Sequence, residues 1–109
     1  MSRKAHSYSP WTLDALGVLG RQVSVERRAQ NWTQGELAER AGISIPTLIA
    51  IEKGTPTTAI GTVFEVASLL GIPLVGASED LNARQLIDAR LALLPSRAVK
   101  LRGLDDDNF

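Results

Sequence analysis

The chain has 109 residues, of which 44% are hydrophobic and 22% are charged, a composition typical of a single globular domain. The absence of cysteine excludes disulfides, thiolate zinc sites and cysteine nucleophiles, and the single histidine, His6, has too few potential partners for a metal site or a histidine-based triad. Twelve basic residues balance twelve acidic ones, so the sequence indicates mixed surface patches rather than one strongly basic field.

The sequence contains no recognisable nucleophile–base pair and no metal-ligand spacing, so we expect no enzymatic activity, no cofactor and no metal. No apolar run reaches the length of a membrane span, and nothing near Met1 resembles a signal peptide. We therefore expect a cytoplasmic protein that has no membrane partner.

The first ten residues are polar and end in Ser9-Pro10, which predicts a flexible N-terminal arm over residues 1–10. A first helix is predicted from Trp11 to Gln30, with Thr12 as its N-cap. Its apolar residues recur at helical spacing, at Leu13, Leu16, Leu19 and Val23.

A capping box predicts the start of the second helix. Thr33 is followed three residues later by Glu36, so each side chain can satisfy a backbone N–H of the other residue. The helix is expected to run to about Ala41, and Gly42 supplies the left-handed conformation that commonly ends a helix.

A third, short helix is expected to begin after Ser44 as its N-cap. Pro46 falls in the first turn, where its missing N–H costs little. The helix is predicted to run to Glu52 or Lys53 and to end at Gly54.

Two further helices are predicted in the second half of the chain. One spans Ile60 to Leu70, and its expected apolar stripe consists of Ile60, Val63, Phe64, Ala67 and Leu70. The other runs from about Asn82 to Leu94, and its expected apolar side consists of Leu86, Ile87, Leu91 and Leu94. The predicted division of the chain is an arm over 1–10, a domain of four helices over 11–76, a C-terminal helix over 77–94 and a tail over 95–109.

The segment from residue 33 to 54 has the geometry of a helix-turn-helix, in which the N-terminal end of the second helix can enter the major groove of DNA. The alternative is an unspecialised helical hairpin in a small bundle. Pairs of carboxylates such as Glu79 and Asp80 are more typical of helix starts than of a catalytic site.

These residues resemble the Xre/Cro-type helix-turn-helix family over about Leu16 to Leu74. The resemblance rests on Thr33-Gln34-Gly35-Glu36-Leu37-Ala38, Ala41-Gly42-Ile43-Ser44, Thr47-Leu48 and Ile51-Glu52-Lys53-Gly54. It implies an all-α, five-helix, lambda-repressor-like DNA-binding domain whose recognition helix spans about Ile45 to Lys53. It also implies a phosphate contact from Gln34 and a structural ion pair between Arg27 and Glu52, for which two separately solvated charges are the alternative.

The recognition helix departs from the usual pattern of the family, because much of its exposed face cannot hydrogen-bond a base. Ser44, Thr47 and Lys53 are the exceptions. Apolar contact with thymine methyl groups, readout of DNA shape and loss of tight DNA binding are the alternatives at this point. The predicted DNA-binding residues are Thr33, Gln34, Ser44, Ile45, Pro46, Thr47, Ile49, Ala50 and Lys53.

Tight binding to a double-stranded DNA operator is expected to need a homodimer with two half-sites. The candidate dimer surface combines Phe64, Leu69 and Leu70 with the fifth helix and residues 72–76, and the alternative is that these residues only close the core of the monomer, as some of them must. Backbone contacts are predicted for Arg3, Lys4, Arg28 and Arg40, against the alternative of ordinary solvated side chains, and Trp32 is expected to pack in the core.

The tail ends in an acidic run and an aromatic residue. It is either a disordered solubilising tail or a docking peptide for a protein partner, formed by Asp105, Asp106, Asp107 and Phe109. The small size, the C-terminal extension and the Leu70-Gly71-Ile72-Pro73-Leu74 segment are similar to HipB-like antitoxins. That resemblance implies repression of the protein's own operon and neutralisation of a HipA-type kinase toxin. The alternatives are a stand-alone repressor and a protein-interaction module that has lost tight DNA binding.

Overall fold

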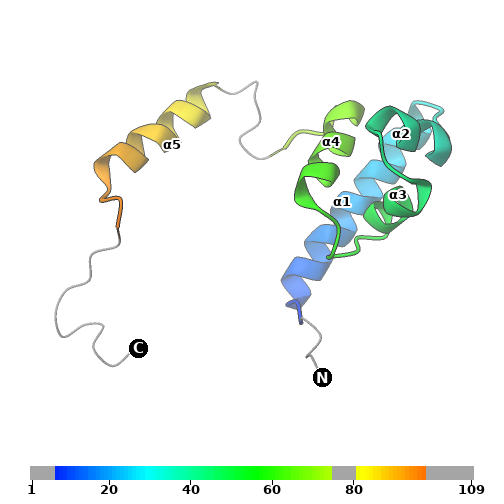
Figure 1. Ribbon diagram of the computed structural model, residues 1–109, viewed down its shortest axis with the longest axis horizontal. Coiled ribbons are helices and arrows are strands. Elements are labelled where there is room, and N and C mark those ends of the chain that lie inside the picture. Colours follow the sequence, from blue (N-terminus) through cyan, green and yellow to red (C-terminus); the bar gives the residue numbers. More distant parts are fainter. Residues whose placement is uncertain (1–6, 75–80, 98–109) are drawn as a thin grey trace. The chain divides into compact units, whose positions relative to one another are not determined.

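The computed structural model describes residues 7–74 and 81–97 and contains five α-helices, with no strand in those ranges (Figure 1). The predicted all-α class is confirmed. The helices are α1 (Pro10–Ala29), α2 (Gln34–Ala41), α3 (Ile45–Glu52), α4 (Ile60–Leu70) and α5 (Leu81–Leu93). None of the helices described is both long and apolar enough to cross a membrane.

The chain divides into two compact units, residues 1–74 and residues 75–109. The first unit holds α1 to α4 and the second holds α5. The predicted flexible arm lies mostly outside the described residues, as does most of the predicted tail, including Asp105, Asp106, Asp107 and Phe109.

The first helix begins earlier than the sequence predicts. Ser9 is its N-cap, and the Ser9 hydroxyl accepts a hydrogen bond from the backbone N–H of Thr12 over 3.3 Å. Pro10 is the first helical residue, a position that suits proline because the N–H there would have no intrahelical acceptor. The assignment of Thr12 as the cap and of Pro10 to the arm is therefore wrong.

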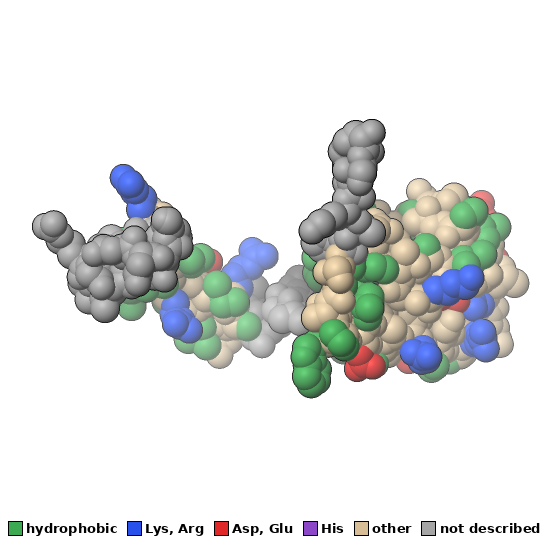
Figure 2. Space-filling view, turned by 90° about the horizontal axis from the view of Figure 1, so that it is seen from below, with side chains coloured by type: hydrophobic (Ala, Val, Ile, Leu, Met, Phe, Trp, Pro, Cys, Tyr) green, Lys and Arg blue, Asp and Glu red, His purple; other side chains and the backbone are tan. Residues whose placement is uncertain are grey.

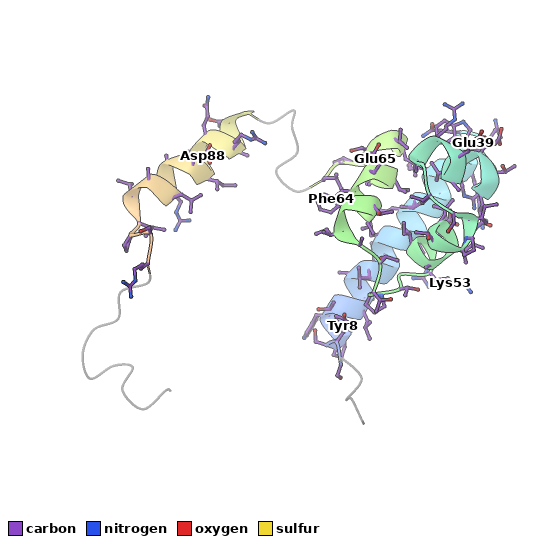
Figure 3. The ribbon with its side chains drawn as sticks, viewed as in Figure 1. Tyr8, Glu39, Lys53, Phe64, Glu65 and Asp88 are labelled. Carbon is purple, nitrogen blue, oxygen red and sulfur yellow. The ribbon has the colours of Figure 1, made fainter. Side chains whose placement is uncertain are left out.

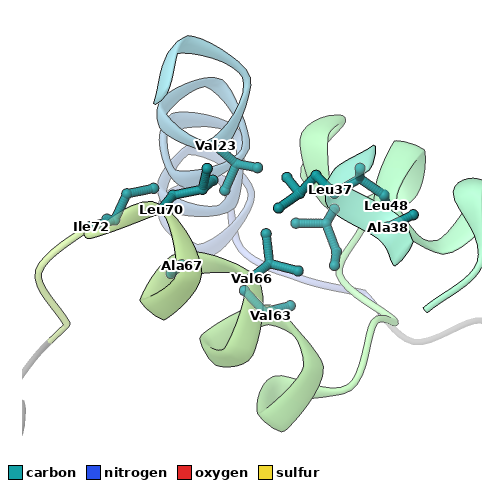
Figure 4. Close-up of a cluster of buried hydrophobic side chains, with 10 residues drawn as sticks. Val23, Leu37, Ala38, Leu48, Val63, Val66, Ala67, Leu70 and Ile72 are labelled. Atoms are coloured by element: carbon teal, nitrogen blue, oxygen red, sulfur yellow. The ribbon is translucent and has the colours of Figure 1, made fainter. Parts of the chain in front are cut away.

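The helices of the first unit enclose one hydrophobic cluster (Figure 4). Val23 of α1, Leu37 of α2, Leu48 of α3 and Val66 of α4 are all fully buried. Each fully buried aliphatic side chain of this kind contributes about 1.5–3 kcal/mol relative to an exposed one. The remaining buried members are Ala38, Ile51, Val63, Ala67, Leu70 and Ile72.

The buried stripe of α4 differs from the predicted one. Ile60 is 71% exposed and Phe64 is 40% exposed, whereas Val66 is fully buried. The buried residues Val63, Val66, Ala67 and Leu70 are spaced three and four apart, so the stripe is rotated toward Val66. Phe64 lies on the side of α4 that faces away from α2 and α3 (Figure 3).

Part of the candidate dimer surface is not available to a second copy. Leu70 and Ile72 are buried within the protomer and close its core. In the second unit, α5 begins and ends one residue before its predicted bounds, and its predicted apolar residues are exposed. The exposed fractions are 61% for Leu86, 56% for Ile87, 63% for Leu91 and 58% for Leu94.

Candidate nucleic-acid interface

The start of α2 is built by the predicted capping box. The backbone N–H of Thr33 donates to Oε1 of Glu36 over 2.8 Å, and the N–H of Glu36 donates to Oγ1 of Thr33 over 3.0 Å. The hydrogen bonds from the backbone and side chain of Thr33 hold the pKa of Glu36 below its ordinary value. These two hydrogen bonds fix the start of α2. The other N–H groups of the first turn have no intrahelical acceptors.

The turn between α2 and α3 depends on Gly42, which has a φ of 71°. After this bend the N–H of Ile43 donates to the carbonyl of Ala38 over 3.0 Å, which closes the end of α2. Ala38 is buried at 2% exposure, as expected for a small residue where two helices cross. The predicted glycine-centred turn is confirmed.

The start of α3 uses its polar side chains for capping. The Ser44 hydroxyl accepts from the backbone N–H of Thr47 over 3.2 Å, and the two hydroxyl oxygens lie 2.8 Å apart in a hydrogen bond. Pro46 lies in the first turn, as predicted. Both hydroxyls that the sequence offers for base contacts are thus engaged with each other.

The starts of α2 and α3 lie next to one another. The ideal position of a Cβ atom on Gly35 would be 3.8 Å from Cδ1 of Ile45, so the Ile45 side chain lies next to the first turn of α2. Ile45 is nevertheless 46% exposed. The structure therefore brings the first turn of α2 together with Ile45 at the start of α3.

The other predicted DNA-binding residues follow along α3. Ile49 and Ala50 are half-buried, and Lys53, the C-cap of the helix, is exposed (Figure 3). Base and phosphate contacts of these side chains stay predictions.

The carboxylate of Glu52 joins the first three helices. Arg27 of α1 donates to it twice, from Nε to Oε2 over 2.7 Å and from Nη2 to Oε1 over 3.2 Å. Oε1 also accepts from Oγ of Ser24 over 2.7 Å and from Nε2 of Gln34 over 3.2 Å. Nη1 of Arg27 donates to the carbonyl of Trp32 over 3.0 Å. The side chains of Arg27 and Glu52 are only 9% and 7% exposed, so the structure contains the expected ion pair in a buried setting.

Burial alone would raise the pKa of Glu52, because it disfavours the charged form. The hydrogen bonds from Arg27, Ser24 and Gln34 outweigh that effect and hold the pKa of Glu52 below its ordinary value. The family resemblance implied the ion pair, but it did not indicate the contact of Ser24, and it assigned Gln34 to phosphate alone. Neither contact has a local sequence signal, because each connects residues of two different helices.

The backbones of α1 and of the end of α3 approach closely because the glycines at the contact have no Cβ atom. A Cβ on Gly20 would lie 2.5 Å from the carbonyl oxygen of Glu52 and 2.6 Å from that of Ile51. Gly54 has a φ of 77°, and a Cβ there would lie 2.9 Å from the backbone of Gly17. Gly17 and Gly20 lie three residues apart in α1, and this spacing of two glycines was the sequence signal for the close contact.

Two further predictions concern cations and an aromatic residue. Trp32 is half-buried against the core, as expected, and the guanidinium of Arg40 lies 4.5 Å from the centre of its ring. Arg28 is exposed, whereas Arg3 and Lys4 lie outside the described residues. On the face of the first unit drawn in Figure 2, basic and acidic side chains are interspersed with hydrophobic ones.

Comparisons with known proteins place these features in a family. A family model described as helix-turn-helix matches residues 26–76. An uncharacterised HTH-type transcriptional regulator of Sinorhizobium fredii is 40% identical over 53 residues, which make up 49% of this chain and 70% of that protein. An uncharacterised HTH-type transcriptional regulator of Methanocaldococcus jannaschii is 38% identical over 48 residues, 44% of this chain and 73% of that protein.

No solved structure gives a significant match. The segment matched by the family model contains the capping box of α2, the bend at Gly42 and the whole of α3. The chain therefore belongs to the helix-turn-helix family.

Proposed function

We propose that the protein is a sequence-specific DNA-binding antitoxin that represses its own operon as a homodimer and neutralises a HipA-type kinase toxin. The observation that carries the DNA-binding part is the adjacency of the starts of α2 and α3, with Ile45 lying next to the first turn of α2. In a helix-turn-helix this arrangement lets one helix enter the major groove while the other lies over the phosphate backbone.

The starts of the two helices have different tasks in this proposal. The first turn of α2 offers backbone N–H groups and the positive end of the helix dipole to a phosphate, together with the amide of Gln34. The start of α3, from Ser44 to Thr47, enters the groove. The bonds that Glu52 accepts from Arg27 and Gln34 connect the end of α3 to α1 and α2.

The homodimer is proposed because a single small domain covers too little DNA for tight and specific binding. Phe64 and Leu69 of α4 remain partly exposed after the core is closed, and Leu86 and Ile87 remain exposed on α5. Within each unit, these residues are our candidates for contact with a second copy. Two copies would read two half-sites about one helical turn apart.

The antitoxin role rests on the resemblance to HipB-like proteins and on the acidic tail. We assign toxin binding to Asp105, Asp106, Asp107 and Phe109, with the aspartates facing a basic rim and the phenyl ring in an apolar pocket. Co-purification from the native operon tests this role. A kinase-like protein should accompany the full chain and be lost when residues 105–109 are deleted, with DNA binding retained. Recovery of the chain alone would favour a stand-alone repressor.

Titration of the protein against the duplex upstream of its own reading frame tests the DNA-binding role. The control is a duplex of the same length and composition in scrambled order. We expect selective binding that weakens with salt, with log K falling by about 0.9 per phosphate contact for each unit of log salt. Equal affinity for both duplexes would instead favour a protein-interaction module, the alternative that the apolar face of α3 supports.

A further inference from the structure

The outward face of α3 carries almost no hydrogen-bonding side chain. Pro46, Ile49, Ala50 and Lys53 are spaced three and four residues apart, so they share the side of the helix opposite the buried Leu48. Pro46 is exposed, and Ile49 and Ala50 are half-buried. Lys53 is the one residue of this stripe that can donate a hydrogen bond, and it stands at the far end of the helix.

The polar residues at the start of α3 add little hydrogen-bonding capacity to this face. The hydroxyls of Ser44 and Thr47 bond to each other over 2.8 Å, and Ser44 also accepts from a backbone N–H. Beside them, the exposed part of Ile45 extends the apolar surface toward α2. A groove that received this end of α3 would meet mainly methyl and methylene groups.

We propose that α3 recognises thymine through its 5-methyl group, with Ile45, Pro46 and Ile49 as the contacting residues. This inference rests on the proposed function, in which α3 lies in the major groove. Thymine is the base that presents a methyl group there, whereas the other base edges present mainly hydrogen-bond donors and acceptors. Against a G·C pair an apolar side chain covers polar groups and gains no methyl contact in return, so G·C pairs are disfavoured at the same positions.

Deoxyuridine substitution is the direct test, because it removes the thymine methyl and preserves the base pair. The preferred duplex of the full chain is first selected from a random library, and each thymine is then replaced singly by deoxyuridine. We expect Kd to rise about fourfold for each contacted methyl that is removed. Replacement of thymines outside the protected site is the control and should leave Kd unchanged.

Variants of α3 connect the effect to particular side chains. In Ile45→Ala and in Ile49→Ala, the deoxyuridine penalty should disappear at the thymine that the lost side chain contacted. Ile60→Ala on α4, where the side chain is 71% exposed, is the matched control and should retain every penalty. Thermal unfolding checks that the variants fold; if Ile49→Ala does not, Ile45→Ala carries the test, because its side chain is 46% exposed.

The outcomes separate this inference from the function on which it rests. A selected site that binds equally well with thymine or deoxyuridine throughout would overturn the inference and leave sequence-specific binding intact. Penalties of equal size in the native chain and in both α3 variants would assign the methyl contacts to other residues and also overturn it. Failure to select any sequence would overturn the proposed DNA-binding function itself.

Discussion

Gln34, the first residue of α2, donates a hydrogen bond from Nε2 to Oε1 of Glu52, the last residue of α3, over 3.2 Å. The same oxygen accepts from Ser24 and Arg27 of α1. One carboxylate at the end of the proposed recognition helix thereby connects three helices. The orientation of α3 relative to α2 depends on a polar cluster as well as on the hydrophobic core.

Replacement of Arg27 should strongly destabilise the fold, because it leaves the Glu52 carboxylate buried without its cation. Arg27→Met is expected to lower the free energy of unfolding by about 3–5 kcal/mol. Denaturant titration at neutral pH measures the change. Arg28→Met, at the exposed neighbouring residue, is the control and should change stability by less than about 0.5 kcal/mol. Equal effects of the two substitutions would show that the buried ion pair contributes no more to the free energy of unfolding than the exposed arginine does.

Stability should decrease in acid because of Glu52. Its pKa in the folded state lies below the ordinary value, so its contribution is fully present above the unfolded pKa near 4.5 and is lost as pH falls through the lower folded value. Glu52→Gln should therefore lower stability at neutral pH and flatten the decrease below about pH 5. Glu65→Gln, on the exposed side of α4, is the control. An unaltered acid profile in Glu52→Gln would refute this assignment.

Gln34→Glu tests the contact between α2 and α3 with a side chain of nearly the same shape. An added negative charge at a helix N-terminus normally stabilises. Here it would stand about 3.2 Å from a carboxylate oxygen and remove a donor, so we expect a net loss of about 1–2 kcal/mol at neutral pH. The loss should shrink in acid. Gln22→Glu, on the exposed side of α1, is the comparison, and a stabilised Gln34→Glu protein would contradict the prediction.

Two glycine-to-alanine substitutions should have opposite signs. Gly20→Ala places a methyl group 2.5 Å from the Glu52 carbonyl oxygen, so α1 and α3 must separate and stability should fall by more than about 1 kcal/mol. Gly61→Ala in α4 meets nothing within 4 Å and should gain about 0.5–1 kcal/mol from helix propensity. Thermal unfolding of both variants measures the difference. Increased stability in both variants would mean that α1 and α3 can separate at Gly20 without a loss of stability.

The predictable parts of the fold were those with local causes. The capping box at Thr33, the bend at Gly42 and the cap at Ser44 each need only residues a few positions apart. The first cap was misplaced because Ser9 and Thr12 are both suitable cap residues, and only the structure distinguishes them.

The remainder depends on contacts between distant residues. Whether Phe64 or Val66 of α4 faces the core depends on how the helix is rotated against its neighbours, and a short apolar sequence fits both rotations. The bonds from Ser24 and Gln34 to Glu52 span 28 and 18 residues and need the folded chain to exist. For the candidate site, the sequence therefore predicted the residue types, and the family resemblance implied one ion pair, but neither indicated the polar cluster around that pair.

The central claim is that the adjacent starts of α2 and α3 form the surface that contacts DNA. The most direct test follows the backbone amide signals of the isotope-labelled full chain by NMR while its selected duplex is added. The account predicts the largest shifts at residues 33–36 and 44–50, with the exposed side of α1 around Gln22 little changed. Shifts that avoid both helix starts, in the presence of tight duplex binding, would contradict it.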